Sequence, residues 1–140
     1  MGGINTNRVL LGGVVAGIVG IASSWVFHGV VLMGRYAIAQ KAGLLFAKPQ
    51  LGFMPVYMVA LLGQGILLAF LYAAARPRLG AGPKTAVAVG LVTAFIGGLP
   101  AYAQAAWSPV GRFVALMQLL DVVVACVGGA LVAGALYKES

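Results

Sequence analysis

Asp121 is the residue with the clearest chemical potential, because it is the only acidic side chain outside the extreme C-terminus. It lies within a long apolar run of Leu, Val, Ala and Gly. A charged side chain at the centre of a bilayer costs about 3 kcal/mol or more, so the carboxylate must face protein, water or a partner. We therefore expect Asp121 to contact polar groups on other helices, with His28 or Gln64 as its partner.

Depth along the chain indicates which polar residues can meet Asp121. Asp121 follows Arg112 by nine residues, which is about 13 Å along a helix that rises by about 1.5 Å per residue. His28 lies near the end of its own apolar run, on the same side if neighbouring spans run up and down. The predicted polar cluster within the membrane consists of Ser24, His28, Gln64, Gln104, Gln118 and Asp121.

Two interpretations of this cluster stay open. Polar side chains often serve only as hydrogen bonds between membrane helices, typically worth less than about 2 kcal/mol each. Alternatively, intramembrane acids mark proton and ion paths, with Asp121 binding the charge and His28 tuning it. A metal site is not expected, because hard divalent cations require about six or more oxygen ligands and no second carboxylate is near.

His28 suggests a further alternative, the binding of a tetrapyrrole, either a pigment or a haem. Ser24 four residues before it and Gly29 directly after it leave space beside the imidazole for a flat macrocycle. A ring nitrogen would then be the axial ligand. No second histidine exists, so a bis-histidine haem within one chain is excluded. No other cofactor is expected.

Enzymatic function is not expected. Ser23, Ser24, His28 and Asp121 include the residue types of a catalytic triad, but there is no nucleophile elbow or oxyanion-hole motif. Cys126 is alone, which excludes an intrachain disulfide and a cysteine metal cluster. We predict a non-catalytic protein.

The composition indicates that lipid is the main solvent of this chain. Hydrophobic residues make up 62% of the sequence and charged residues only 8%, against about 25% charged in soluble domains. The net charge of +7 comes from Lys and Arg between apolar runs, where cations flank membrane spans. A nucleic-acid role would require a basic face on a soluble module. The expected organisation is one domain, 1–140, without nucleic-acid binding.

Four apolar runs are long enough to cross a hydrocarbon core about 30 Å thick. They predict an all-α bundle of four transmembrane helices. Gly34 and Arg35 should end the first span, and Pro100 should bend the third. The predicted spans are 9–33, 53–75, 85–107 and 113–137.

The segment 35–48 is too short and too charged to span. Lys41 and Lys48 are seven residues apart on one helical face, with apolar residues between them. This pattern predicts a short interfacial helix that Pro49 ends, with an ordinary structured loop as the alternative.

Small residues recur at helical spacing and predict helix-packing faces. Gly13 and Gly17 form a GxxxG pair, which lets another helix approach closely. Such faces on at least three spans suggest a structural or accessory subunit that packs against copies of itself or other membrane subunits. The residues predicted to pack are Gly13, Gly17, Gly97, Ala125, Gly129 and Ala133.

Cations set a weak bias in the topology. The side with both termini carries five Lys and Arg residues and the opposite side four, which favours cytoplasmic termini. Binding of anionic lipid around Lys41 at the inner leaflet would invert this assignment. The residues predicted to contact lipid phosphates are Arg76, Arg78, Lys84 and Lys41.

The segments Arg8–Gly17, Leu71–Gly80, Gly82–Ala86 and Gly129–Tyr137 resemble a family of small four-span bacterial membrane proteins of unknown function. The resemblance covers nearly the whole chain. It implies a four-helix architecture in a bacterial inner membrane, without a settled activity. Similar proteins carry a carboxylate in the first span, where this chain has Ser23-Ser24-Trp25.

Overall fold

The computed structural model describes residues 3–50 and 52–138, and the regular structure within these ranges is entirely helical, which confirms the all-α prediction. In chain order the elements are α1 (Thr6–Ser24), the π-helix η1 (Trp25–Val31), α2 (Met33–Lys41), α3 (Phe53–Leu79), α4 (Pro83–Gln104), the 3₁₀-helix η2 (Ala105–Trp107) and α5 (Arg112–Leu136).

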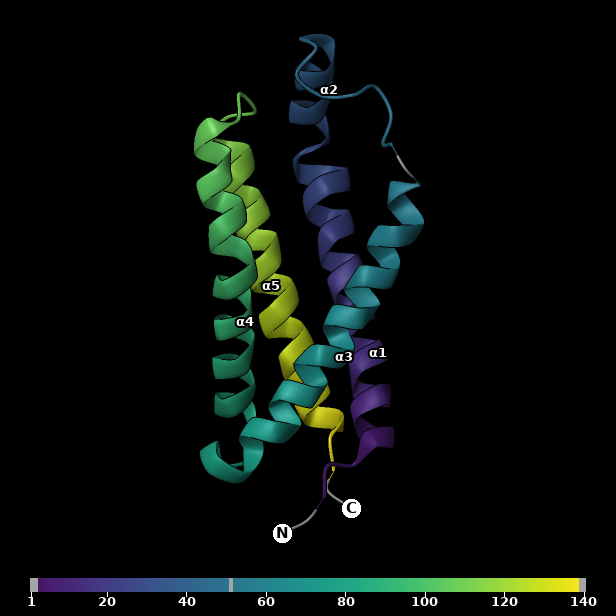
Figure 1. Cartoon of the computed structure of the whole chain (residues 1–140), viewed down its shortest axis with the longest axis vertical. Coiled ribbons are helices and arrows are strands. Elements are labelled where there is room, and N and C mark those ends of the chain that lie inside the picture. Colours follow the sequence, from purple (N-terminus) through teal and green to yellow (C-terminus); the bar gives the residue numbers. More distant parts are fainter. Residues whose placement is uncertain (1–2, 51, 139–140) are drawn as a thin grey trace.

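Four of these helical stretches are long and apolar enough to cross a membrane. They are Thr6–Val31, Phe53–Leu79, Pro83–Gln104 and Arg112–Leu136. Helices satisfy their backbone hydrogen bonds internally, which lipid requires. In Figure 1 both termini and the α3–α4 turn lie at one end of the bundle, and α2 and the α4–α5 connection lie at the other. The two ends are called here the terminal end and the α2 end.

The observed boundaries of the spans differ slightly from the predicted ones. Helix α3 continues to Leu79 with Pro77 inside it, four residues beyond the predicted end. Helix α4 begins at Pro83. The first N–H groups of a helix have no partner within it, so the missing N–H of proline costs no hydrogen bond there. Gly80 and Gly82 both have positive φ values, 86° and 126°, which shape the turn between these helices.

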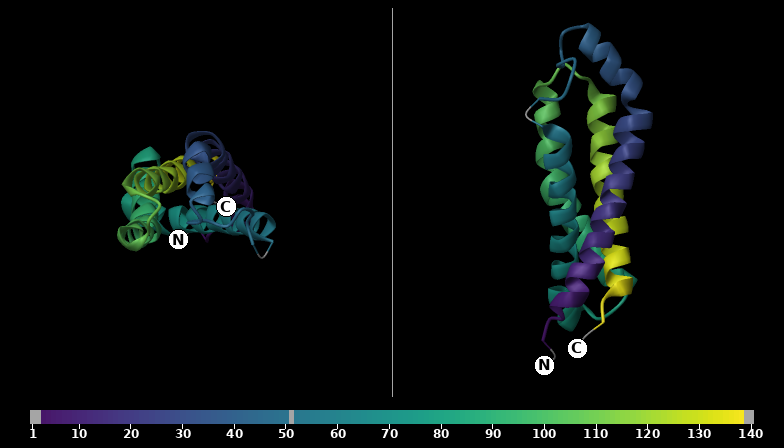
Figure 2. Two further views of the ribbon diagram at one scale, coloured as in Figure 1. Left: turned by 90° about the horizontal axis from the view of Figure 1, so that it is seen from above. Right: turned by 90° about the vertical axis from the view of Figure 1, so that its right-hand side faces the viewer.

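The segment after the first span combines the two predicted alternatives. Helix η1 ends at Val31 rather than at Gly34, and α2 follows it and tilts back over the α2 end of the bundle (Figure 2). Gly43 has a φ of 73° and ends α2, since the N–H of Leu44 bonds the carbonyl of Ala39 in a Schellman-type cap. The remainder to residue 50 is not helical. The prediction of a helix to Lys48 was therefore wrong.

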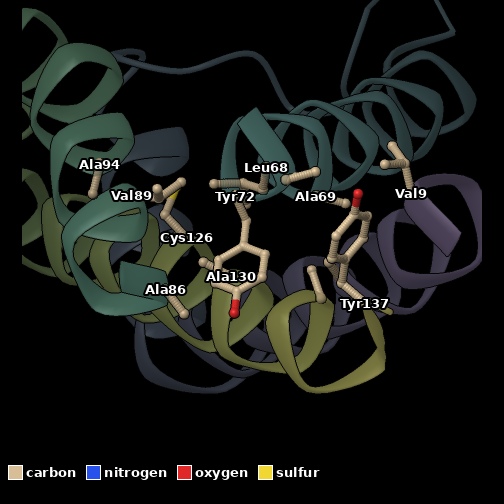
Figure 3. Packing of buried hydrophobic residues seen from close by; sticks show 13 residues of the cluster. Val9, Leu68, Ala69, Tyr72, Ala86, Val89, Ala94, Cys126, Ala130 and Tyr137 are labelled. Atoms are coloured by element: carbon tan, nitrogen blue, oxygen red, sulfur yellow. The ribbon is translucent and has the colours of Figure 1, made fainter. Parts of the chain in front are cut away.

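The core of the bundle consists mainly of small side chains. Helix α1 packs against α3 and α5, and α4 packs mainly against α5. Among the labelled residues of Figure 3, Tyr72 and Tyr137 are the large exceptions, both near the terminal end. Their rings meet edge to face, with centroids 6.2 Å apart. The Tyr72 hydroxyl accepts from the N–H of Gly82 at 3.0 Å, which ties the α3–α4 turn to the core.

Glycines allow α1 and α3 to approach backbone to backbone. A Cβ built on Gly65 would collide with the carbonyl oxygen of Gly13 and the backbone nitrogen of Gly17. Cβ atoms on Gly13 and Gly17 would in turn lie 2.5 Å from the Cα of Ile66 and 2.7 Å from the Cα of Leu62. The GxxxG pair therefore packs against a helix of the same chain.

The other predicted packing residues divide into two groups. Ala125, Gly129 and Ala133 are buried on α5. Gly97 is exposed, and a Cβ on it would meet no heavy atom within 4 Å, so it does not pack against another helix of this chain, and its packing against a partner stays a prediction. The neighbouring Gly98 faces α5 instead, with Leu119 Cδ1 2.7 Å from its built Cβ. The buried residues Ala86, Gly90, Ala94 and Gly98 recur at steps of four, whereas a predicted face with alternating steps of four and three continues from Gly90 to Gly97.

A methyl group at Gly65 should separate α1 from α3. We expect Gly65→Ala to lower the free energy of unfolding in mild detergent by about 1–3 kcal/mol, the usual cost of overpacking. The matched control is Gly63→Ala, because a Cβ there meets nothing within 4 Å. Alanine in a helix interior is favoured over glycine by about 0.5–1 kcal/mol, so the control should be neutral or stabilising. Equal destabilisation of the two variants would contradict the close approach.

Candidate functional site

The Asp121 carboxylate on α5 is buried, with 3% of the residue exposed, and it faces the end of the first span. Ser23 donates to Oδ1 at 2.6 Å, and Ser24 donates to Oδ2 at 2.9 Å. His28 Nε2 lies 3.3 Å from Oδ2. The expected contact with His28 is therefore present. Gln64 instead donates to Cys126 Sγ at 3.1 Å.

A change of helix type aligns these donors. Ser23 and Ser24 end α1, and His28 lies in the π-helical turns of η1. The wider register shows in the bond from the N–H of Leu32 to the carbonyl of Phe27, five residues earlier. Short π-helical segments are rare and occur frequently at functional sites. Here it begins directly after Ser24, so the three groups that contact the carboxylate lie on both sides of the change of helix type.

A second layer of hydrogen bonds extends the network toward the α2 end. Tyr36 of α2 places its hydroxyl 2.8 Å from His28 Nδ1, and the two rings stack with centroids 5.9 Å apart. Gln118, one turn before the acid on α5, donates to the same hydroxyl at 3.0 Å. Tyr57 of α3 lies 3.0 Å from Ser24 Oγ. Five helical elements, α1, η1, α2, α3 and α5, thus contribute to one network.

The inventory of protons gives the network a direction. Ser24 has one hydroxyl proton and gives it to Asp121, so the Tyr57 hydroxyl donates to Ser24. Tyr36 accepts from Gln118, so its proton is available to His28 Nδ1. A His28 ring that accepts this proton at Nδ1 carries its own proton on Nε2, directed at Asp121. Every donor in the network then points toward an ionised carboxylate.

The balance of charge around this carboxylate is unusual. The guanidinium of Arg35 on α2 lies over the ring of Phe113, 5.2 Å from its centroid. In the part of the chain that the structure describes, the ion-pair partner of Asp121 is His28, whose charge depends on a proton. Among the described residues, no group of three His, Cys, Asp or Glu side chains is placed to hold a metal ion. The site therefore gains or loses its net charge through a single proton on the Asp121–His28 pair.

Two cavities flank the network. A cavity of about 420 Å³, the apolar cavity, lies between η1 and the first turns of α3, with Trp25, Phe53 and Met54 among its lining residues. A cavity of about 310 Å³, the polar vestibule, lies at the α2 end and includes Gln104, Gln118 and Ser108. Tyr36 lines both. The hydrogen-bonded chain through Tyr36 therefore joins the vestibule to the buried acid.

The predicted polar cluster is only partly one network. Asp121, Ser24 and His28 are in contact, and Gln118 joins them through Tyr36. Gln64 bonds Cys126, and Gln104 is an exposed residue of the polar vestibule. Ser23, Tyr36 and Tyr57 were not among the predicted residues. Two tyrosines could have been considered from the sequence, because Tyr36 follows the first span and Tyr57 lies near the start of the second.

The cations predicted to contact lipid lie near the ends of the bundle. Arg78, Lys84 and Lys41 are exposed. The guanidinium of Arg76 lies over the ring of Tyr137, 5.6 Å from its centroid. Contact of these side chains with lipid phosphates stays a prediction.

The contacts of His28 do not favour the binding of a tetrapyrrole or a role in a catalytic triad. Both ring nitrogens face protein groups, so an axial ligand would have to break a contact with Tyr36 or Asp121. In a triad the histidine lies between serine and aspartate. Here Ser23 and Ser24 bond Asp121 directly, so the histidine does not activate them through this network.

The fold and the site define an integral membrane protein with a buried carboxylate paired with a partly exposed histidine. No protein-family model, curated protein or solved structure matches the chain.

Burial raises the pKa of the Tyr36 phenol above its ordinary value of 10.0, while the bond from Gln118 opposes the shift. A group whose folded-state pKa is raised stabilises the fold below its unfolded pKa, and this contribution is lost as pH rises. We expect Tyr36→Phe to reduce the alkaline loss of stability between about pH 9 and 11. Thermal unfolding in detergent across this range measures the effect.

The exposed Tyr102 provides the matched control, as Tyr102→Phe. Gln118→Leu should raise the pKa of Tyr36 further, because the amide N–H stabilises the phenolate, and absorbance of tyrosinate reports this directly. Parallel behaviour of the two phenylalanine variants would contradict the burial of Tyr36.

Proposed function

We propose that this protein is a small non-catalytic transporter that couples movement of its substrate to a proton held by Asp121 and His28. The observation that carries the proposal is the buried carboxylate whose ion-pair partner is a histidine. Intramembrane acids paired in this way mark proton and ion paths. Histidine is the side chain suited to exchange a proton near neutral pH.

The polar vestibule supports access for a proton from the α2 end. Gln118 and Tyr36 lie between the vestibule and His28, and each consecutive pair is within hydrogen-bond distance. On the other side of the acid, Cys126, Leu68 and Ala130 fill the core. A path open on one side suits a transporter that alternates between two conformations better than a continuous channel.

The purely structural alternative makes a different prediction. If the network only joins helices, replacing the carboxylate by an amide would alter stability without removing a transport activity. Serine, tyrosine and glutamine bonds between membrane helices are commonly of that kind. The distinction therefore rests on proton movement and cannot be drawn from stability alone.

We expect purified protein in liposomes to carry protons when a gradient of a monovalent cation (sodium, potassium, ammonium or an organic ammonium ion) is imposed across the membrane. Internal pH, followed with a trapped dye, is the measurement. Asp121→Asn should reduce this flux to the level of protein-free liposomes, because the amide cannot exchange the proton. The control is Thr93→Val, since the Thr93 hydroxyl bonds Val89 within its own helix.

Both variants should retain the helical circular-dichroism spectrum and elute as the wild type does from a sizing column. Wild-type liposomes without flux under every gradient would overturn the transporter proposal. Undiminished flux with Asp121→Asn would overturn the role of the acid.

The accessory-subunit hypothesis has less support than the sequence alone gave it. Its motivation was the number of small-residue faces, and Gly13, Gly17 and Gly129 now have partners within the chain. Lipid remains the surrounding partner in this proposal. The resemblance to four-span bacterial proteins supports a bacterial cytoplasmic membrane, and the five cations at the terminal end support cytoplasmic termini.

A substitution at Gly97 can test assembly of the protein without disturbing its fold. A side chain there has space within the chain, so we expect Gly97→Leu to preserve the fold. If α4 packs against another copy through this exposed glycine, the variant should shift the complex to smaller mass in mild detergent. Unchanged mass by light scattering would count against an interface at this position.

A further inference from the structure

We propose that the apolar cavity binds a lipophilic monocation, which is the substrate class of the transporter. This inference rests on the proposed function, because it uses the same Asp121–His28 pair. The cavity volume of about 420 Å³ lies within the range of about 300–1,000 Å³ typical of small-molecule sites.

The walls of the cavity suit a bulky cation with apolar substituents. Phe53 and Tyr57 stack with centroids 5.1 Å apart and form one wall. Trp25 on η1 is 68% exposed and also lines the cavity. Aromatic faces attract cations through their quadrupoles. Met54 and Met58 complete the lining with side chains that adapt to ligands of different shape.

The polar end of the cavity provides the charge complement. Ser24, His28 and Tyr57 line it, and the Asp121 carboxylate lies one contact behind Ser24 and His28. Among the described residues, those that line this cavity include no Lys or Arg. A neutral acyl chain would suit the apolar walls, but it would leave the negative end without a complement. An anion would meet the carboxylate unfavourably. A monocation satisfies both features.

The same geometry makes the proton and the cation competitors. With a proton on His28 the Asp121–His28 pair is neutral overall, and the cavity loses its attraction for a cation. The other titratable groups around the pair are the phenols of Tyr36 and Tyr57 and the thiol of Cys126. None of these carries a positive charge in any protonation state. Binding of the cation therefore expels one proton, which is the exchange that a proton-linked transporter requires.

The test uses tetraphenylphosphonium, a lipophilic cation, and tetraphenylborate, an anion of nearly the same size and shape. Equilibrium dialysis of purified protein in mild detergent measures binding of each. We expect the wild type to bind the phosphonium at least about tenfold more tightly than the borate, a difference of about 1.4 kcal/mol. The affinity for the phosphonium should fall as the pH is lowered, with one proton released for each cation that binds to the protonated Asp121–His28 pair.

Two variants with a matched control locate the site. Trp25→Leu should weaken phosphonium binding about tenfold, the value of a partly desolvated cation–π contact. Trp107→Leu is the control, because Trp107 is 90% exposed and lies outside the cavity. Asp121→Asn should remove both the preference for the cation and the release of the proton.

Equal binding of the two ions by the wild type would overturn the inference and would indicate a cavity for neutral apolar molecules such as lipid tails. Equal loss in the two tryptophan variants would also overturn it. Failure of the proposed function is read separately, from proton flux measured without either ion. Flux without phosphonium binding would leave the transporter proposal standing and remove this substrate class.

Discussion

A carboxylate in a hydrocarbon layer must find hydrogen-bond donors, and the structure of this chain is arranged around that requirement. Ser23, Ser24 and His28 supply the donors to Asp121 from the end of the first span. They can do so only if α1 and α5 lie close together. Close packing follows from small residues further along the same helices, where a Cβ on Gly12 would lie 3.3 Å from the Cα of Ala133. Glycine packing near the terminal end therefore positions polar chemistry near the α2 end.

The bundle is consequently asymmetric along the membrane normal. Toward the terminal end, alanines, Leu68 and the Tyr72–Tyr137 pair form a closed core, and the Tyr137 hydroxyl accepts from the N–H of Asn5 at 3.2 Å. Toward the α2 end, α3 diverges from the first span in Figure 1, and both cavities beside the network lie there. Asp121 lies between the closed half and the open half of the bundle. At this position its charge can control the access of ions or protons from the α2 end.

Sequence patterns predicted the helical class, the four spans and the contact between Asp121 and His28, because run length and depth both follow from the helical rise. They could not predict the participation of Tyr36, since the π-helix η1 changes the helical register between the first span and α2. In α4 the residue that faces α5 is Gly98 rather than Gly97, because the buried residues of this helix recur at steps of four. Helix α2 ends early because Gly43 has a left-handed conformation. The periodicity of apolar residues in the sequence does not predict this conformation.

The most direct measurement of the central claim is nitrogen-15 magnetic resonance of the protein in lipid bilayers, because His28 is the only histidine and gives an unambiguous imidazole signal. The neutral ring is predicted to carry its proton on Nε2, directed at Asp121, with Nδ1 accepting from Tyr36. Asp121→Asn should change the Nε2 resonance, and Tyr36→Phe should change that of Nδ1. A neutral ring protonated on Nδ1, or a spectrum unaffected by Asp121→Asn, would contradict the account.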